Sequence, residues 1–301
     1  MNAKTIVEVR SLTKAYGKMR ALDQVSFRME EGKIYGLLGR NGAGKTTLMH
    51  ILTAQWFATS GEVRIFGEDP YENNNVLRRV CFIKESQLYP KSLRVKDVFD
   101  LSASFFPNWD AAFADSLARE FDLPLTRRMG KLSRGMLSSV GIIVGLASRA
   151  PLTIFDEPYL GLDAVARGLF YDRLLADYAE HPRTIVLSTH LIDEVSRLLA
   201  HVLLIDGGRL VADEDAEVLR ASAYTVEGRA NDVDAFAADR DVLHREKIGG
   251  SARAVVRGTF NAETKRQAER MGLAAGPVSL QELFIRMTGT AMKARKEEIG
   301  Q

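Results

Sequence analysis

The sequence predicts an α/β fold built on a mainly parallel, doubly wound sheet. Three apolar runs, 34–38, 152–156 and 184–190, indicate buried strands, and segment 202–208 indicates a further one. Helical patterns lie between them, the clearest over 167–179. Strands that alternate with helices favour parallel pairing, because each helix carries the chain back to the end of the sheet where the next strand starts.

The bulk properties restrict the class of protein. A chain of 301 residues with 46% hydrophobic residues can form one large domain or two ordinary ones. Its net charge of +2 gives no nucleic-acid signal. Cys81 is the single cysteine, which excludes an internal disulfide and indicates a reducing compartment. The first residues lack a signal-peptide core, and the near-apolar stretch 140–147 is too short to cross a bilayer. We therefore expect a soluble protein that acts at a membrane only through a partner.

Residues 39–47 fit the phosphate-binding pattern G-x-x-x-x-G-K-[ST]. A strand precedes them and an apolar helix, 46–52, follows, so backbone N–H groups and a helix N-terminus converge on one anion. Lys45 is expected to reach the β- and γ-phosphates, and the Thr46 hydroxyl to ligate Mg²⁺. The expected nucleotide-binding residues of this loop are Gly39, Asn41, Gly42, Ala43, Gly44, Lys45, Thr46 and Thr47.

Two carboxylates and a histidine stand at the ends of predicted strands. Asp156 ends the second apolar run, where it is placed to hold Mg²⁺. Glu157 comes next, at a point where the chain turns, and can activate a water against the γ-phosphate. His190 ends the third run, which we expect beside the second, so its ring can orient that water.

The other segments give coarser expectations. Segments 5–10 and 22–29 alternate as half-buried antiparallel strands, and between them Tyr16 can either stack on a base or plug the turn. Strands are expected at 61–67 and 80–84. The region 95–150 is expected to be helical, with one apolar stripe along a helix that ends before Leu123-Pro124. That stripe consists of Trp109, Phe113, Leu117 and Phe121.

The C-terminal part has a different pattern. Strands are expected at 224–227, 242–247 and 252–257, and helices at 232–238 and 262–271, in the order of a β-α-β-β-α-β unit. Ser279 and Glu282 form a capping box before a short amphipathic helix. The charged tail from residue 291 is expected to be solvated.

The ordered set of motifs resembles the nucleotide-binding subunits of ABC transporters over residues 5–215. Loop 39–47 is similar to Walker A, run 152–156 to Walker B with Glu157 as catalytic glutamate, and 161–163 to the D-loop. His190 resembles the switch histidine and Tyr16 the adenine-stacking aromatic. The resemblance implies a P-loop NTPase fold with an antiparallel β subdomain and a helical subdomain near 93–150. It places the ATP-binding domain at 1–215 and an accessory α+β domain at 216–301.

Two departures from the family pattern stand out. The signature, usually Leu-Ser-Gly-Gly-Gln, reads Leu-Ser-Arg-Gly-Met at 132–136. Ser133 and Gly135, which the family uses against the γ-phosphate of the opposite subunit, are retained. The usual glutamine that contacts Mg²⁺ and water after strand 80–83 is replaced within Lys-Glu-Ser-Gln at 84–87. Glu85 is expected to take its place at the metal, and Gln87 is the other candidate.

The resemblance also implies cofactors and partners. ATP and Mg²⁺ are expected as cofactors and ATP hydrolysis as the reaction, with two copies stacked head to tail; a homodimer is expected, and an unequal pair stays open. A separate integral membrane permease is the expected partner, which places the chain in the cytoplasm on the inner face of the membrane. Loop 88–90 either docks that permease or packs the helical subdomain. Segment 279–289 is similar to the closing helix of export-type subunits.

Two alternatives belong to other classes. A soluble ABC ATPase that acts on nucleic acid or the ribosome usually has two nucleotide domains or a long coiled coil, and this chain shows one phosphate loop and no sustained heptads. No direct nucleic-acid contact is therefore expected. A P-loop GTPase is disfavoured because no Asn-Lys-x-Asp motif occurs.

Overall fold

The computed structural model describes residues 4–85 and 87–288. They group into two compact units. The first holds the described residues up to His190 together with Leu203–Leu210; the second holds Leu191–Val202 and the described residues from Val211. The chain thus passes between the units three times, after His190, Val202 and Leu210.

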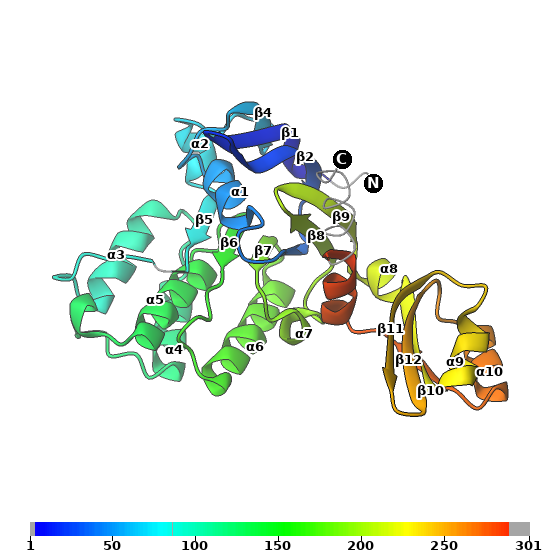
Figure 1. The fold of residues 1–301 in the computed structure, drawn as a ribbon. Coiled ribbons are helices and arrows are strands. Elements are labelled where there is room, and N and C mark those ends of the chain that lie inside the picture. The colour runs from blue at the N-terminus through cyan, green and yellow to red at the C-terminus, as the bar shows by residue number, and fades with distance from the viewer. Residues whose placement is uncertain (1–3, 86, 289–301) are drawn as a thin grey trace. The chain divides into compact units, whose positions relative to one another are not determined.

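A six-stranded sheet confirms the predicted α/β class, and most of its residues belong to the first unit (Figure 1). Four neighbouring strands are parallel, so their carboxyl ends meet at one edge. Three of them, β6, β7 and β3, are buried along their whole length, because helices cover both faces of such sheets. In spatial order the strands are β5 (Val80–Ile83), β6 (Leu152–Asp156), β7 (Thr184–Ser188), β3 (Ile34–Leu38), β8 (His201–Asp206) and β9 (Arg209–Asp215).

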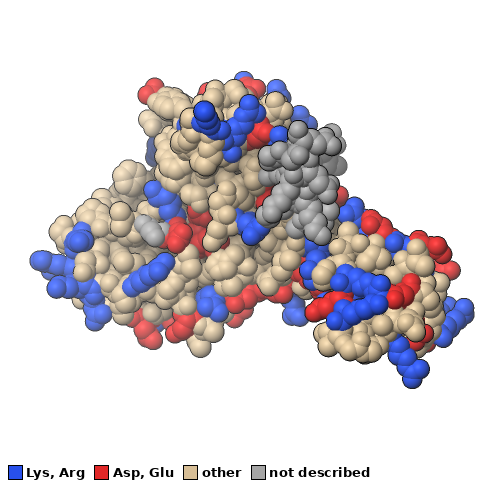
Figure 2. All heavy atoms as spheres, viewed as in Figure 1, with Lys and Arg blue, Asp and Glu red and all other residues tan. Residues whose placement is uncertain are grey.

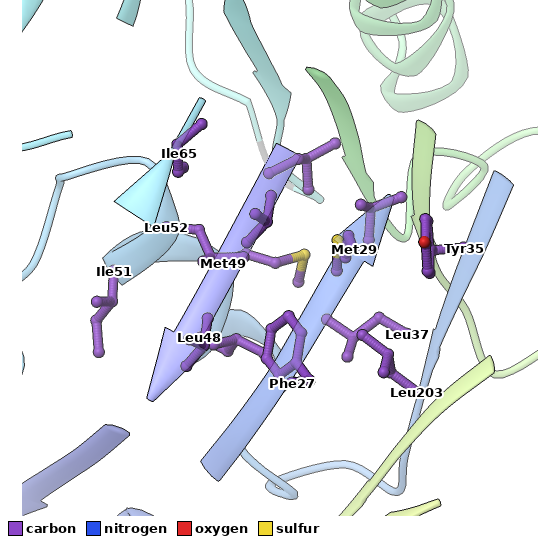
Figure 3. Packing of buried hydrophobic residues seen from close by; sticks show 14 of the residues in the cluster. Phe27, Met29, Tyr35, Leu37, Leu48, Met49, Ile51, Leu52, Ile65 and Leu203 are labelled. Atoms are coloured by element: carbon purple, nitrogen blue, oxygen red, sulfur yellow. The ribbon is translucent and has the colours of Figure 1, made fainter. Parts of the chain in front are cut away.

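A smaller antiparallel sheet, in the order β2-β1-β4, comes from the N-terminal region. Its strands are β1 (Thr5–Tyr16), β2 (Met19–Glu30) and β4 (Ser60–Ile65). Figure 3 shows Phe27 and Met29 of β2 packed with Leu48 and Met49 of α1 (Lys45–Leu52). Leu37 of β3 belongs to the same core. This shared core fixes the helix that follows the phosphate loop.

The helical region contains α3 (Val95–Phe105), α4 (Ala111–Glu120), a 3₁₀ turn at Met129–Lys131 and α5 (Arg134–Ala147). The predicted stripe is only partly correct. Asp110 caps α4 by accepting the Phe113 N–H at 2.8 Å, so the helix begins after Trp109. Leu117 alone of the four predicted residues is fully buried. The face of α4 that packs inward consists of Ala114, Leu117 and Ala118.

Helix α5 packs against β5 and β6. Two glycines, Gly141 and Gly145, stand four residues apart on its inner face. A Cβ at Gly145 would lie 2.3 Å from the ring of Phe155. The helix therefore approaches β6 more closely than a side chain would allow. The other helices of the first unit are α2 (Asn74–Leu77) and α6 (Ala164–Glu180).

The second unit confirms the predicted β-α-β-β-α-β order. Its antiparallel sheet runs β11-β12-β10-β13. Helical residues 280–288 follow it, and the guanidinium of Arg253 donates to both oxygens of Glu282, each at 2.6 Å. In chain order the elements are α7 (Ile192–Val195), α8 (Ala216–Ala221), β10 (Ala223–Arg229), α9 (Ala230–Ala237), β11 (Val242–Ile248), β12 (Ser251–Arg257), α10 (Ala262–Arg270) and β13 (Ala274–Pro277).

Charges on the surface are mixed. Figure 2 shows Lys and Arg side chains interspersed with Asp and Glu over the face in view. On the second unit, for example, Arg245 and Lys247 both pair with Asp234. Within residues 4–85 and 87–288, no helix combines the length and hydropathy that a membrane span requires.

Candidate active site

The phosphate loop joins β3 to α1. Gly42 and Gly44 adopt φ angles of 78° and 109°, in the left-handed region that favours glycine. At Gly44 there is also no room, since a Cβ would lie 2.4 Å from the carbonyl oxygen of Ala21. No side chain caps α1, so the N–H groups of its first turn have no side-chain acceptor. The loop is therefore shaped as a cradle for an anion.

Lys45 lies at the centre of this cradle. Its side chain is buried, and its ammonium donates to the carbonyl oxygens of Gly39 at 2.7 Å and Arg40 at 3.3 Å. Burial lowers the pKa of Lys45, while the nearby carboxylates of Glu157 and Asp156 act in the opposite direction. The ammonium thus lies within an oxygen-lined loop, where a bound phosphate would stabilise the protonated form and raise the pKa of Lys45.

Two oxygen groups that can ligate a metal lie in contact beside the loop. The Thr46 hydroxyl, at the start of α1, donates to a carboxylate oxygen of Asp156 at 2.9 Å. Asp156 is buried at the carboxyl end of β6. A hydroxyl and a carboxylate are the hard oxygen ligands that Mg²⁺ prefers when it also binds phosphate oxygens. The residues present therefore fit this metal.

These groups line a single cavity of about 460 Å³, a size suited to a small ligand. Tyr16 lines it with 44% of its surface exposed, and its ring lies nearly perpendicular to that of Trp56 at a centroid distance of 6.4 Å. Glu85 lines this cavity, whereas Gln87 lines a neighbouring groove. The structure thus places Glu85, and not Gln87, beside the phosphate loop. The cavity is lined by Tyr16, Met19, Ala21, Asn41, Gly42, Ala43, Gly44, Lys45, Thr46, Thr47, Glu85, Asp156 and Glu157.

The hydrolytic pair predicted from two separate strands is brought together. Strands β6 and β7 are adjacent and parallel, with Asp156 opposite Ser188. The next residues of each strand therefore lie side by side, and the Glu157 N–H donates to the Ser188 carbonyl at 3.1 Å. A carboxylate oxygen of Glu157 lies 2.8 Å from Nδ1 of His190. This arrangement can orient and deprotonate a water.

Sequence reasoning missed two residues of this cluster, Tyr159 and Thr189. The Tyr159 hydroxyl contacts the carboxylate of Glu157 and lies 2.7 Å from the Thr189 hydroxyl. The signal was weak, because one aromatic residue in a turn after Pro158 usually packs against a core. The available signal was that Tyr159 stands two residues after Glu157.

The signature residues lie on another cavity. Ser133 caps α5 by accepting the Met136 N–H at 3.2 Å. A Cβ at Gly135 would lie 2.6 Å from the carbonyl oxygen of Gly161. Ser133 and Gly135 share a cavity of about 580 Å³ with residues 161–163, and no residue of the nucleotide cavity lines it. One chain therefore presents the phosphate loop and the signature as two separate surfaces.

The site combines a glycine-rich anion cradle after β3 with a buried lysine, a Thr–Asp oxygen pair and a Glu–His pair. This combination defines a P-loop nucleoside triphosphatase. Comparisons with known proteins identify the family. The family model described as ABC transporter matches residues 22–160. The bacitracin transport ATP-binding protein BcrA of Bacillus licheniformis is 32% identical over 212 residues, covering 69% of each chain. The chain belongs to the ATP-binding subunits of ABC transporters, and it is an ATPase.

Other relatives extend the comparison. YtrB of Bacillus subtilis, an ABC transporter ATP-binding protein, is 27% identical and covers 71% of this chain and 74% of its own. Nod factor export ATP-binding protein I of Paraburkholderia xenovorans is 28% identical and covers 95% of this chain and 98% of its own. A solved ATP-binding subunit of an ABC transporter superimposes with a TM-score of 0.65 at 27% identity, covering 71% of this chain and 92% of that one.

Proposed function

We propose that this chain is the ATP-hydrolysing subunit of an exporter and works through a separate membrane permease. A relative that spans nearly the whole chain, 95% of it, is named for export of Nod factor. That alignment therefore extends over both compact units. A subunit with this role acts in the cytoplasm, on the inner face of the membrane.

The observation that carries the proposal is the separation of two half-sites on one chain. The nucleotide cavity holds the phosphate loop, and the other cavity holds Ser133 and Gly135. Two copies stacked head to tail bring the signature of one copy onto the nucleotide of the other. Both sites then form together, so in a symmetric homodimer each phosphate loop faces the signature of the other copy.

Distinct roles in the proposed site belong to several residues of the nucleotide cavity and to His190. Lys45 and the loop N–H groups hold the β- and γ-phosphates, and Tyr16 stacks on the adenine. The oxygens of Thr46, Asp156 and Glu85 hold Mg²⁺, which neutralises phosphate charge when bound. Glu157 accepts the proton of the attacking water and His190 orients that water.

A permease surface is proposed beside the nucleotide cavity. A groove of about 210 Å³ lies between the segment after β5 and helix α5, with Leu88 at its edge 90% exposed. A large apolar side chain held in water favours a protein partner. The apolar walls of the groove come from Ile83, Leu88, Leu137, Gly141 and Pro158.

The deciding experiment is the mass of Glu157→Gln by light scattering, with and without Mg-ATP. A variant that binds but does not hydrolyse ATP should shift from its 33.4 kDa monomer to twice that mass when ATP is added. Adding Lys45→Ala to the same chain should abolish the shift. A Glu157→Gln chain that turns over ATP at the parental rate would remove Glu157 from the role of base. A chain that stays monomeric with bound ATP would contradict the homodimer.

A further inference from the structure

We propose that Tyr159 is a positioning residue for ATP hydrolysis, holding the carboxylate of Glu157 and the ring of His190 in one fixed arrangement. This inference rests on the proposed function, because it assigns Glu157 and His190 the roles given above. Tyr159 lies in the turn after β6 and is 3% exposed. It is therefore part of the cluster and not of the surface.

The hydroxyl of Tyr159 is the common point of four contacts. It donates to the carboxylate of Glu157, and it accepts the backbone N–H of His190 at 3.2 Å. It also lies 2.7 Å from the Thr189 hydroxyl and 3.2 Å from Nδ1 of the His190 ring. A phenol has one donor and two acceptor positions, so the contacts with Glu157, Thr189 and the His190 N–H use its hydrogen-bonding capacity, and Nδ1 of His190 is left for the Glu157 carboxylate.

The direction of the Glu157 contact follows from the chemistry of the phenol. Burial, together with the neighbouring Glu157 carboxylate, raises the pKa of Tyr159 well above its ordinary value. The hydroxyl therefore keeps its proton near neutral pH. It remains a donor to the carboxylate and an acceptor for the His190 N–H.

The backbone explains why Glu157 needs such a partner. Glu157 adopts a φ of 49°, in the left-handed region that few residues other than glycine occupy. Such a conformation persists only where surrounding contacts hold it. The Glu157 N–H binds Ser188, which fixes the backbone; the Tyr159 and His190 contacts fix the carboxylate.

The first test compares Tyr159→Phe with a matched control, Tyr178→Phe, in the full chain. Tyr178 lies on α6, and its hydroxyl donates to the carbonyl of Gly32, so the control also loses one phenol hydrogen bond. We expect Tyr159→Phe to lower kcat about ten- to a hundredfold, with KM for ATP changed by less than about twofold. Tyr178→Phe should keep the parental kcat. An unchanged kcat in Tyr159→Phe, or a joint loss of kcat, ATP affinity and melting temperature, would overturn the positioning role.

The second test asks whether Tyr159 acts through Glu157. In a Glu157→Gln background, Tyr159→Phe should cause no further loss of the residual kcat, because residues that act as a unit are not additive. A multiplicative loss would overturn the inference. Parental turnover by Glu157→Gln alone would overturn the proposed function and this inference together. An inactive Glu157→Gln with a fully active Tyr159→Phe would overturn only the inference.

Discussion

The guanidinium of Arg134 lies 3.6 Å from the carboxylate of Glu85. Arg134 is one of the two departures from the family pattern in the signature, Glu85 belongs to the departure after β5, and the two residues contact each other within one chain. Both side chains are largely exposed, at 68% and 49%, so the pair is weak. It nevertheless draws a proposed metal ligand toward the signature helix.

Arg134→Gly should therefore free the carboxylate of Glu85 for the metal. We expect the Mg²⁺ concentration that half-saturates ATP hydrolysis to fall by about two- to fivefold, the range that an exposed ion pair allows. Glu85→Gln should abolish this shift in the double variant. If the double variant shows the same shift as Arg134→Gly, then Glu85 does not hold the metal.

ATP affinity should depend on pH through Lys45. Burial lowers the pKa of Lys45 in the free protein, and bound phosphates should raise it again. The bound state then keeps the proton to a higher pH than the free state, so affinity stays constant near neutral pH and falls as pH rises through the free pKa. Titration calorimetry between pH 7 and 10 measures this decline. Lys45→Ala should bind ATP weakly, with a flat pH dependence; a decline equal to the parent's would assign it to another group.

Two glycine substitutions should change stability in opposite directions. Gly135→Ala places a Cβ 2.6 Å from the carbonyl oxygen of Gly161, so it should lower the melting temperature of the first unit. Gly168 lies in α6, where a Cβ would meet nothing within 4 Å. Gly168→Ala should stabilise by about 0.5–1 kcal/mol, because alanine loses less backbone entropy in a helix. Calorimetry of both variants checks the signs, and stabilisation by Gly135→Ala would contradict the close approach.

Acid should remove a contact of the second unit. The guanidinium of Arg253 holds the pKa of Glu282 below its usual value. A lowered pKa gives stability that is present above the ordinary value near 4.5 and lost as pH falls through the folded-state pKa. Arg253→Met should therefore lower the melting temperature at pH 7 by more than at pH 3. An equal loss at both values would mean that lost packing, and not charge, accounts for the effect.

The sequence predicted the site best where chemistry restricts residue type. Fixed places in a strand–helix pattern are occupied by the phosphate loop, by Asp156 and Glu157 at the carboxyl end of β6, and by His190. Their convergence therefore followed from the expected strand neighbours. Tyr159 was missed because a buried aromatic residue is ordinary until its hydroxyl is located. The pairing of Arg134 with Glu85 was missed because sequence separation hides contacts between a loop and a helix terminus.

The fold shows the same division. Periodicity predicted the βαββαβ order of the second unit. It misplaced the stripe on α4, because the Asp110 cap decides where the helix starts and hydrophobic spacing alone does not show that position. Periodicity also did not predict that the chain passes between the two units three times. These crossings depend on contacts between distant segments, such as Asp193, which accepts the backbone N–H of Gln281 at 3.3 Å.

Because of those crossings, the second unit is built from two segments that are separated in the sequence by residues of the first unit. The segment Leu191–Val202 contributes to the second unit through Ser196, whose carbonyl accepts from Arg220, and through Ala200, whose carbonyl accepts the Ala216 N–H at 3.0 Å. A protease cut near residue 215 would separate this segment from its partners without releasing a complete domain. Transfer of the second unit to a related cassette would likewise require two grafts, and the first begins one residue after His190.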